Sequence, residues 1–124
     1  MEKQMFVEWM GLKLNLKGTR EKVAYEKKHG SPLKEVFKLM SMLDVVEKLD
    51  THEDVDFDKL EIPSLEFMAN LIHASAQKLN SGTTMEVVFD LMDIYLEEHS
   101  IFDLVAVVVE VLVHANYLNF EEQQ

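Results

Sequence analysis

The most strongly apolar stretch of the chain lies near its C-terminal end. Nine of the ten residues in the range 104–113 are apolar, and Glu110 is the only polar one. On a helical wheel, the apolar residues from position 101 onward cover roughly 260° of arc, whereas a surface helix usually buries a stripe of about 100°. The pattern predicts a helix over 101–118 with more apolar surface than a small domain covers. It therefore predicts association with another chain.

A buried strand is the alternative for this segment, because valine lowers helix propensity and favours strands. However, the segment is long for a strand, and Ser100 with Asp103 forms a capping-box pattern that starts a helix. A membrane span is not expected. Such a span needs about 20 apolar residues with few charges, and this segment is shorter and contains Asp103 and Glu110.

Period-two alternation marks the N-terminal part of the chain. Leu12, Leu14 and Leu16 alternate with polar residues, which is typical of a half-buried strand. Gly11 precedes them where a tight turn would be needed, and residues 5–9 supply a pairing partner. The pattern predicts a short β-hairpin within residues 1–17.

Four more helices are predicted between the hairpin and the last helix. The first starts at the N-cap Thr19 and ends before Gly30, and the second, capped by Ser31, covers residues 32–49. The third starts near Ser64, and the fourth starts at Thr83, which forms a capping-box pattern with the residue three positions on. Their predicted inward-facing residues are Leu33, Val36, Phe37, Leu39, Met40, Leu43, Val46, Leu65, Met68, Ala69, Ile72, Ala76, Leu79, Met85, Val88, Phe89, Met92 and Leu96.

These elements predict a mainly α fold, namely a helical bundle of about five helices with a short N-terminal β-hairpin. Length and the lack of a linker predict a single domain over residues 1–124. Periodicity lapses over residues 50–63, where acidic residues accumulate, and this segment is predicted to be a solvated acidic loop. Residues 121–124 are predicted to be a frayed tail.

Charge is distributed unevenly along the chain, which has a net charge of −11. Residues 1–38 contain nine basic and five acidic residues, and the remainder contains three basic and eighteen acidic ones. The acidic bulk argues against nucleic-acid binding, which requires basic residues to displace counterions. We expect the basic end of one copy to face the acidic helix of another. The candidate self-association residues are Lys13, Lys17, Arg20, Lys27, Lys28, Asp90, Asp93 and Glu97, and the candidate apolar partner surface is Phe102, Val107, Val109, Val111 and Val113.

No group of residues in the sequence has the spacing of a catalytic, metal or cofactor site. Cysteine is absent, the histidines lack any zinc-binding spacing, and the four glycines do not form a phosphate-binding loop. Asp54, Asp56 and Asp58 have the spacing that begins a calcium loop, but Lys59 and Leu65 occupy positions that need glycine and glutamate. We therefore expect a protein that is not an enzyme. The eight methionines are interpreted as core filler, with a methionine-lined groove for a partner helix as the alternative.

The order of the elements resembles that of a known family. An LKLNLK strand precedes a charged helix, GTREKVAYEKKHG, and an SPL helix start; after the acidic loop come SLEFMANLIHASAQKLNSGTTMEVVFDLMDIYLEE and the apolar helix. Over residues 12–118 this resembles the small tail assembly chaperones of long-tailed bacteriophages. The resemblance implies a non-enzymatic protein that self-associates and coats the tape-measure protein in the cytoplasm of the infected bacterial cell. It also implies absence from the mature virion, and a longer frameshifted form that contacts the major tail tube protein.

A second function class fits the composition. A small acidic regulator or immunity-type protein would bind one basic protein partner as a monomer or dimer, and its acidic surface would serve that partner alone. The mass of the protein in solution separates the two classes, because a chaperone of the first kind forms larger assemblies.

Overall fold

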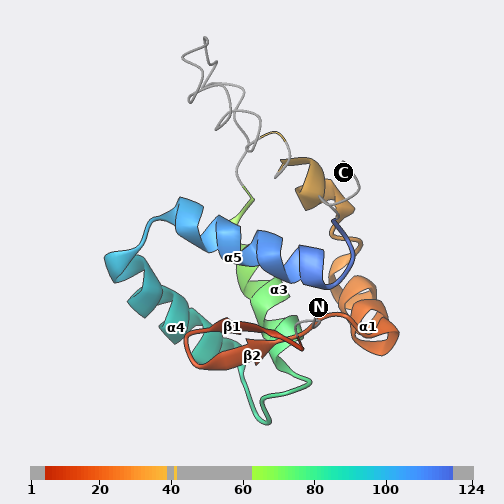
Figure 1. Ribbon diagram of the computed structural model, residues 1–124, viewed down its shortest axis with the longest axis horizontal. Coiled ribbons are helices and arrows are strands. Elements are labelled where there is room, and N and C mark those ends of the chain that lie inside the picture. Colours follow the sequence, from red (N-terminus) through yellow and green to blue (C-terminus); the bar gives the residue numbers. More distant parts are fainter. Residues whose placement is uncertain (1–4, 39–40, 42–62, 119–124) are drawn as a thin grey trace.

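The computed structural model of the protein describes residues 5–38, 41 and 63–118 (Figure 1). Its elements in chain order are β1 (Val7–Trp9), β2 (Leu12–Leu14), α1 (Thr19–His29), a helical segment at residues 33–38, α3 (Leu65–Ala76), α4 (Met85–Glu98) and α5 (Ile101–His114). The predicted fold class, mainly helical with a short N-terminal hairpin, is confirmed. The acidic loop, most of the second predicted helix and the C-terminal tail lie outside the described residues.

The hairpin has the tight turn that Gly11 predicts. Its two strands are antiparallel, and the register pairs Trp9 with Leu12 and Val7 with Leu14. Met10 and Gly11 both have positive φ, at 51° and 81°, as a two-residue type I′ turn requires. Val7, Trp9 and Leu14 are buried, so one face of the ribbon packs on the helices.

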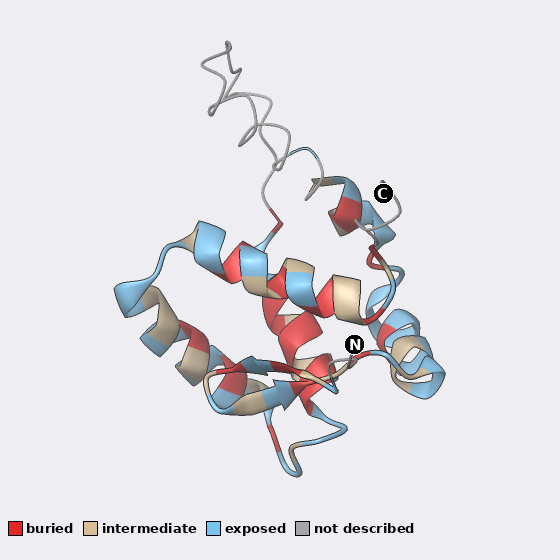
Figure 2. Ribbon diagram, in the orientation of Figure 1, coloured by how far each residue is buried: buried red, intermediate tan, exposed pale blue. Residues whose placement is uncertain are grey.

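Helix α3 is the centre of the fold. It contacts β2, α1, α4 and α5, and buried residues cover most of its surface (Figure 2). Because neighbours cover several of its sides, Phe67 and Leu71 are buried although they were not among the predicted inward residues. Leu65 and Leu79, which were predicted to face inward, are 48% and 43% exposed because they lie at the first residue of the helix and beyond its last one.

The hairpin is attached to α3 by a main-chain hydrogen bond. The backbone N–H of Asn15 donates to the carbonyl oxygen of Ser75 at 2.7 Å. Ser75 is fully buried, and its hydroxyl donates to the carbonyl of Ile72 at 3.0 Å, so this polar side chain is satisfied within its own helix.

The helix caps match the predictions in part. Ser64 caps α3, and Ser100 caps α5 in a reciprocal capping box with Asp103, as predicted. The prediction for α4 is wrong by one residue, because Thr84 is the N-cap and Thr83 instead donates its hydroxyl to the turn before the helix. Thr19 is also not a cap, since α1 begins there and the N-cap is Gly18.

The helical segment at residues 33–38 lies at the edge of the described fold (Figure 2). Val36 is buried there, as predicted. Leu33 and Phe37 are 49% and 73% exposed, so their assignment to the core is wrong. A peripheral helix turns only one narrow side toward the core, and Val36 occupies that side. The other predicted inward residues of this helix lie outside the described residues.

Helix α5 is a helix, as the capping box predicts, and it ends before residue 118. Its last residue is His114, and Asn116 then adopts a positive φ of 70°. The backbone N–H groups of Tyr117 and Leu118 both donate to the carbonyl of Leu112, which closes the helix end. One face of α5 is buried against the rest of the molecule through Leu104, Val105, Val108, Val111 and Leu112.

Candidate protein-interaction site

An acidic stripe runs along the solvent side of α4. It consists of Glu86, Asp90, Asp93 and Glu97, which recur at intervals of three and four residues and therefore share one face of the helix. All four are exposed, as predicted. The structure thus brings together the three acidic candidates for self-association, Asp90, Asp93 and Glu97, on one helix. Thr84 fixes the start of this helix by accepting a hydrogen bond from the backbone N–H of Val87 at 3.2 Å.

A groove lies between α3 and α4, directly beside the acidic stripe. Its volume is about 380 Å³, and apolar side chains make up most of its lining. The lining residues are Leu65, Glu66, Asn70, Met85, Phe89, Met92, Asp93 and Leu96. Because Met85 and Met92 line it together with leucine and phenylalanine, this α3–α4 groove matches the methionine-lined groove that the sequence left as an alternative.

Phe89 lines the α3–α4 groove. The prediction that it is buried in the core is wrong. It is 51% exposed, whereas Val88 beside it is fully buried. The helix turns its Val88 side toward the core, and Phe89 is left at the border between the core side and the acidic stripe. A signal for this was present in the sequence, since Phe89 has acidic residues at positions 86, 90 and 93 around it.

The predicted basic residues do not form one patch. Arg20, Lys27 and Lys28 are exposed on α1, and Lys17 is exposed just before that helix. Lys13 is exposed on the hairpin instead, where its ammonium lies 5.4 Å from the ring centre of Phe6. The structure therefore gathers the basic candidates on α1 and separates Lys13 from them.

The charged candidates have no ion-pair partner within the part of the chain that the structure describes. The ion pair found within the described residues joins Lys38 and Glu35, with 3.5 Å between Nζ of Lys38 and Oε2 of Glu35. Helices α1 and α4 lie on opposite sides of α3 (Figure 1), so their charges cannot pair within one molecule.

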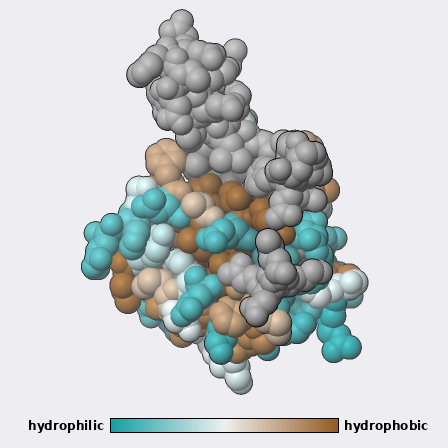
Figure 3. Space-filling view, viewed as in Figure 1, coloured by the Kyte–Doolittle hydropathy of each residue, from teal (hydrophilic) through white to brown (hydrophobic). Residues whose placement is uncertain are grey.

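An apolar strip runs along α5 at the border of its core-facing side. Phe102, Ala106, Val109 and Val113 follow helical spacing along it. Phe102 is 48% exposed and Ala106 is exposed, whereas Val109 and Val113 are partly buried against the core. Figure 3 shows hydrophobic side chains gathered over α5 with hydrophilic groups among them. We call these four residues the α5 strip.

The five residues predicted for an apolar partner surface of α5 do not all lie on one face of the helix. Phe102, Val109 and Val113 lie in the α5 strip. Val107 is half-buried and lies beyond Asp103 on the wheel, away from the strip. Val111 is 1% exposed and belongs to the core, so its assignment to a partner surface is wrong.

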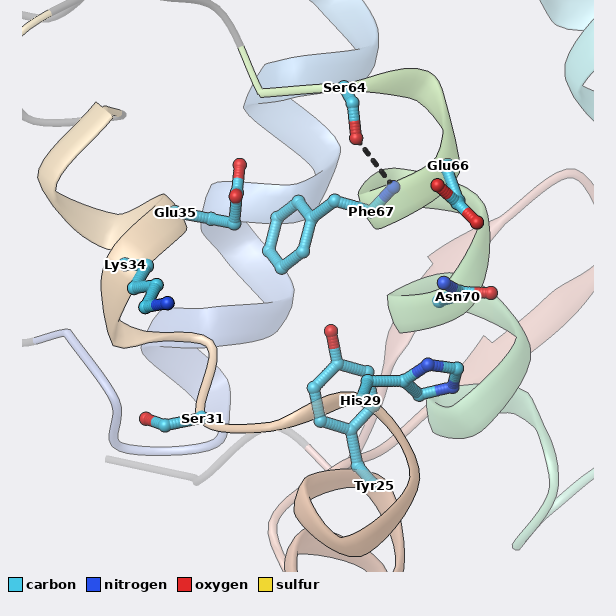
Figure 4. Close-up of a pocket in the computed structure, with 9 residues that line it drawn as sticks. All are labelled: Tyr25, His29, Ser31, Lys34, Glu35, Ser64, Glu66, Phe67 and Asn70. Atoms are coloured by element: carbon cyan, nitrogen blue, oxygen red, sulfur yellow. Dashed lines mark hydrogen bonds between the residues drawn. The ribbon is translucent and has the colours of Figure 1, made fainter.

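A polar pocket of about 310 Å³ lies between α1, the helical segment at 33–38 and α3 (Figure 4). Its lining residues are Tyr25, His29, Ser31, Lys34, Glu35, Ser64, Glu66, Phe67 and Asn70. The ring of Phe67 points into the space beside Glu35, and the hydrogen bond drawn among these nine residues is the cap between Ser64 and the Phe67 backbone, at 3.0 Å.

At the contact between α1 and α3, Tyr25 and His73 have perturbed pKa values. Burial, and secondarily the carboxylate of Glu35, raise the pKa of Tyr25 to about 12. Burial lowers the pKa of His73, and the positive charges of Lys28 and His29 lower it further. Each shift favours the neutral form of the side chain.

In the described residues, no group of three or more histidine, aspartate or glutamate side chains is placed to hold a metal ion. Nor is any helix among them both long and apolar enough to cross a membrane. Comparison with known proteins adds no relative: no protein-family model matches the chain, and neither a curated protein nor a solved structure gives a significant match.

Proposed function

We propose that this protein is a non-enzymatic tail assembly chaperone that self-associates and coats the tape-measure protein while a phage tail is assembled. The resemblance of its element order to that family suggests the client. The structure supports the binding role through three surfaces: the α5 strip, the α3–α4 groove with its acidic stripe, and the basic residues of α1.

The observation that carries the proposal is the α5 strip. Helix α5 already buries five residues in the core, yet Phe102 and Ala106 remain exposed, and Val109 and Val113 are only partly buried beside them. Apolar residues at this spacing can pack against the apolar face of an amphipathic helix from another protein. Amphipathic helices commonly bind apolar surfaces in this way. A long helical client would offer such a face repeatedly, so many copies of this chain could bind along it.

In this proposal the protein acts in the cytoplasm of the infected bacterial cell and is absent from the mature virion. A longer form produced by frameshifting would add a segment that contacts the major tail tube protein. These points come from the family resemblance.

Co-purification with the tape-measure protein tests the proposal. We expect a tagged tape-measure protein, expressed together with this chain, to retain it in many copies. The double variant Phe102→Asp, Val109→Asp should be retained at least about tenfold less, because each carboxylate would be buried against an apolar helix. Ile94→Asp is the matched control, since Ile94 is 53% exposed on α4, close to the exposure of Phe102.

The outcomes are distinct. Retention of the wild type and of Ile94→Asp, with loss of the double variant, supports the proposal. Absence of retention for the wild-type chain would overturn the tape-measure protein as the client. Equal retention of the wild type and both variants would overturn the α5 strip as the binding surface. Circular dichroism of each variant shows whether it is folded.

A second function is favoured by one observation. The acidic stripe beside an apolar groove would also suit an acidic regulator or immunity-type protein that holds a single basic partner. Such a protein would keep a constant small mass at every concentration. Growth of the assembly with concentration, measured by light scattering, would favour the chaperone.

A further inference from the structure

We infer that the α3–α4 groove of one copy receives helix α1 of a second copy, so that copies join head to tail. The inference rests on the self-association in the proposed function and names its two contacting surfaces. The occupant is chosen because α1 has the charge, the apolar centre and the length that the groove requires.

The outer face of α1 is basic with a small apolar centre. Arg20, Val23, Ala24 and Lys27 fall on one face of the helix, at intervals of three and four residues. All four are exposed, and Val23 is 51% exposed. We call these four residues the basic face of α1.

The two carboxylates of α1 are directed away from the basic face. Glu26 accepts a hydrogen bond from the hydroxyl of Tyr117 at 2.6 Å, and Lys22 lies 5.3 Å from the centre of the same ring. Glu21 lines a pocket between α1 and α3, which Ala24 borders at the edge of the basic face. Among the residues that the structure describes on α1, the basic face therefore presents positive charge, as a partner for an acidic stripe needs.

The spacing of the charges on the two helices agrees. Arg20 and Lys27 are seven residues apart on α1, and Asp90 and Glu97 are seven residues apart on α4. At about 1.5 Å per residue, each pair spans roughly 10 Å along its helix axis. When two helices lie side by side, both basic groups can therefore reach a carboxylate at once.

The apolar parts also correspond. The α4 residues that line the groove extend from Met85 to Leu96, which is about 16 Å of helix, and the eleven residues of α1 have nearly the same length. Val23 lies between the two basic groups of α1, and Phe89 lies beside Asp90 and Asp93. Seating α1 would cover the exposed side chains of Val23, Phe89 and Leu65 together.

The positions of α1 and α4 in the fold require the contact between α1 and the groove to form between two copies of the chain. Since α1 and α4 lie on opposite sides of α3, a molecule cannot place its own α1 in its own groove (Figure 1). Two different patches meet in such a contact, so each added copy presents a new groove and a new α1. Contacts of this kind build rings or open helical arrays.

Charge exchange tests this contact. One variant carries Arg20→Glu with Lys27→Glu, and the other carries Asp90→Lys with Glu97→Lys. Each alone places like charges across the contact, and we expect its self-association constant to fall by roughly 100-fold. An equal mixture of the two restores opposite charges at every contact, so the light-scattering mass should return. Restoration on mixing also shows that both variants are folded.

Disulfide trapping locates the contact. Because the chain has no cysteine, the double variant Val23→Cys, Phe89→Cys has only the two introduced thiols. Mild oxidation should give a ladder of covalently linked oligomers, since a disulfide requires Cα atoms within about 7 Å. Val23→Cys with Ile94→Cys is the matched control, because Ile94 is as exposed as Phe89 but lies beyond the acidic stripe, and it should give no ladder.

The results separate this inference from the proposed function. Suppose that the light-scattering mass of the wild type increases with concentration and that of each charge variant increases equally, or that the disulfide ladder forms without a cysteine at position 89. The α1-to-groove contact is then wrong, while self-association stands. If the wild type stays monomeric at all concentrations, the proposed self-association and this inference both fail. Loss in each charge variant with recovery in the mixture supports the contact.

Discussion

The side chain of Asn80 pairs with the backbone of Lys13 as an adjacent strand would. Its Oδ1 accepts a hydrogen bond from the Lys13 N–H at 3.0 Å, and its Nδ2 donates to the Lys13 carbonyl at 2.7 Å. The same Nδ2 donates to the carbonyl of Ala76 at 2.8 Å, at the end of α3. One amide thus satisfies an open edge of β2 and fixes the hairpin to the central helix.

Replacing this amide should loosen the hairpin. We expect Asn80→Ala to lower the free energy of unfolding by about 1 kcal/mol, since the lost hydrogen bonds are exposed and water replaces part of them. Urea unfolding followed by circular dichroism measures the change. Asn70→Ala is the control, because the Asn70 side chain makes no hydrogen bond among the described residues, and it should leave stability unchanged or slightly higher. Equal stability of Asn80→Ala and wild type would contradict the link.

Two valines of α5, only two positions apart, should respond differently to truncation. Val111 is 1% exposed, whereas Val109 is only partly buried. We expect Val111→Ala to cost about 2 kcal/mol, because it leaves a cavity in the core, and Val109→Ala to cost less than about 0.5 kcal/mol. Thermal and urea unfolding of the two variants provide the comparison. Similar losses at both positions would mean that the α5 strip is covered by the chain itself.

The sequence predicted where the turn and the helices lie better than it predicted which side of each helix is buried. Capping boxes and glycines are local signals, so α5 with its Ser100 cap and the turn at Gly11 were predicted correctly. Which valine of α5 is buried depends on where α3 and the hairpin lie against it. Because nearly all residues of this segment are apolar, hydrophobic periodicity does not indicate which side of the helix is buried. Val111 was therefore assigned to the partner surface instead of the core.

The candidate site was predicted to a similar extent. The acidic residues of α4 were placed correctly on one exposed face, because charged residues at helical spacing are seldom buried. The α3–α4 groove was not located, since Phe89 and Leu65 were assigned to the core. The groove is formed by two separate helices, and the angle between them is set by tertiary packing, which no local pattern reveals.

Alkaline pH should destabilise the fold through its tyrosines. All three have a raised pKa: burial is the main cause in each, followed by Glu35 for Tyr25, Asp103 for Tyr95 and the hydrogen bond to Glu26 for Tyr117. An unfolded tyrosine ionises near pH 10, so the folded state retains protons that the unfolded state has lost above that pH.

The stabilisation is therefore complete below about pH 10 and decreases as the pH rises from there through about 12, where Tyr25 ionises. Tyrosinate absorbance of the folded protein should develop above pH 10, and urea unfolding should show falling stability over that range. Tyr25→Phe serves as the control and should reduce the pH dependence. Tyrosines that all ionise near pH 10 in the folded protein would contradict the burial described here.

Salt should weaken the assembly without unfolding its subunits. Raising NaCl from about 0.1 M to about 1 M shortens the Debye length from about 10 Å to about 3 Å, which screens exposed charges such as those of α1 and α4. We expect the light-scattering mass to decrease while the helical circular dichroism signal is retained. An assembly whose mass does not depend on salt would show that the charged residues do not hold it together.

Trp9 gives the molecule an internal optical probe. It is the single tryptophan of the chain, it is 4% exposed on β1, and its ring centre lies 5.6 Å from that of Tyr95 on α4. Its emission therefore depends on whether the ribbon rests on the helices, and a shift to longer wavelength would report that the ribbon has lifted into water. Detachment of the N-terminal ribbon can thus be followed separately from helix melting, without any added dye.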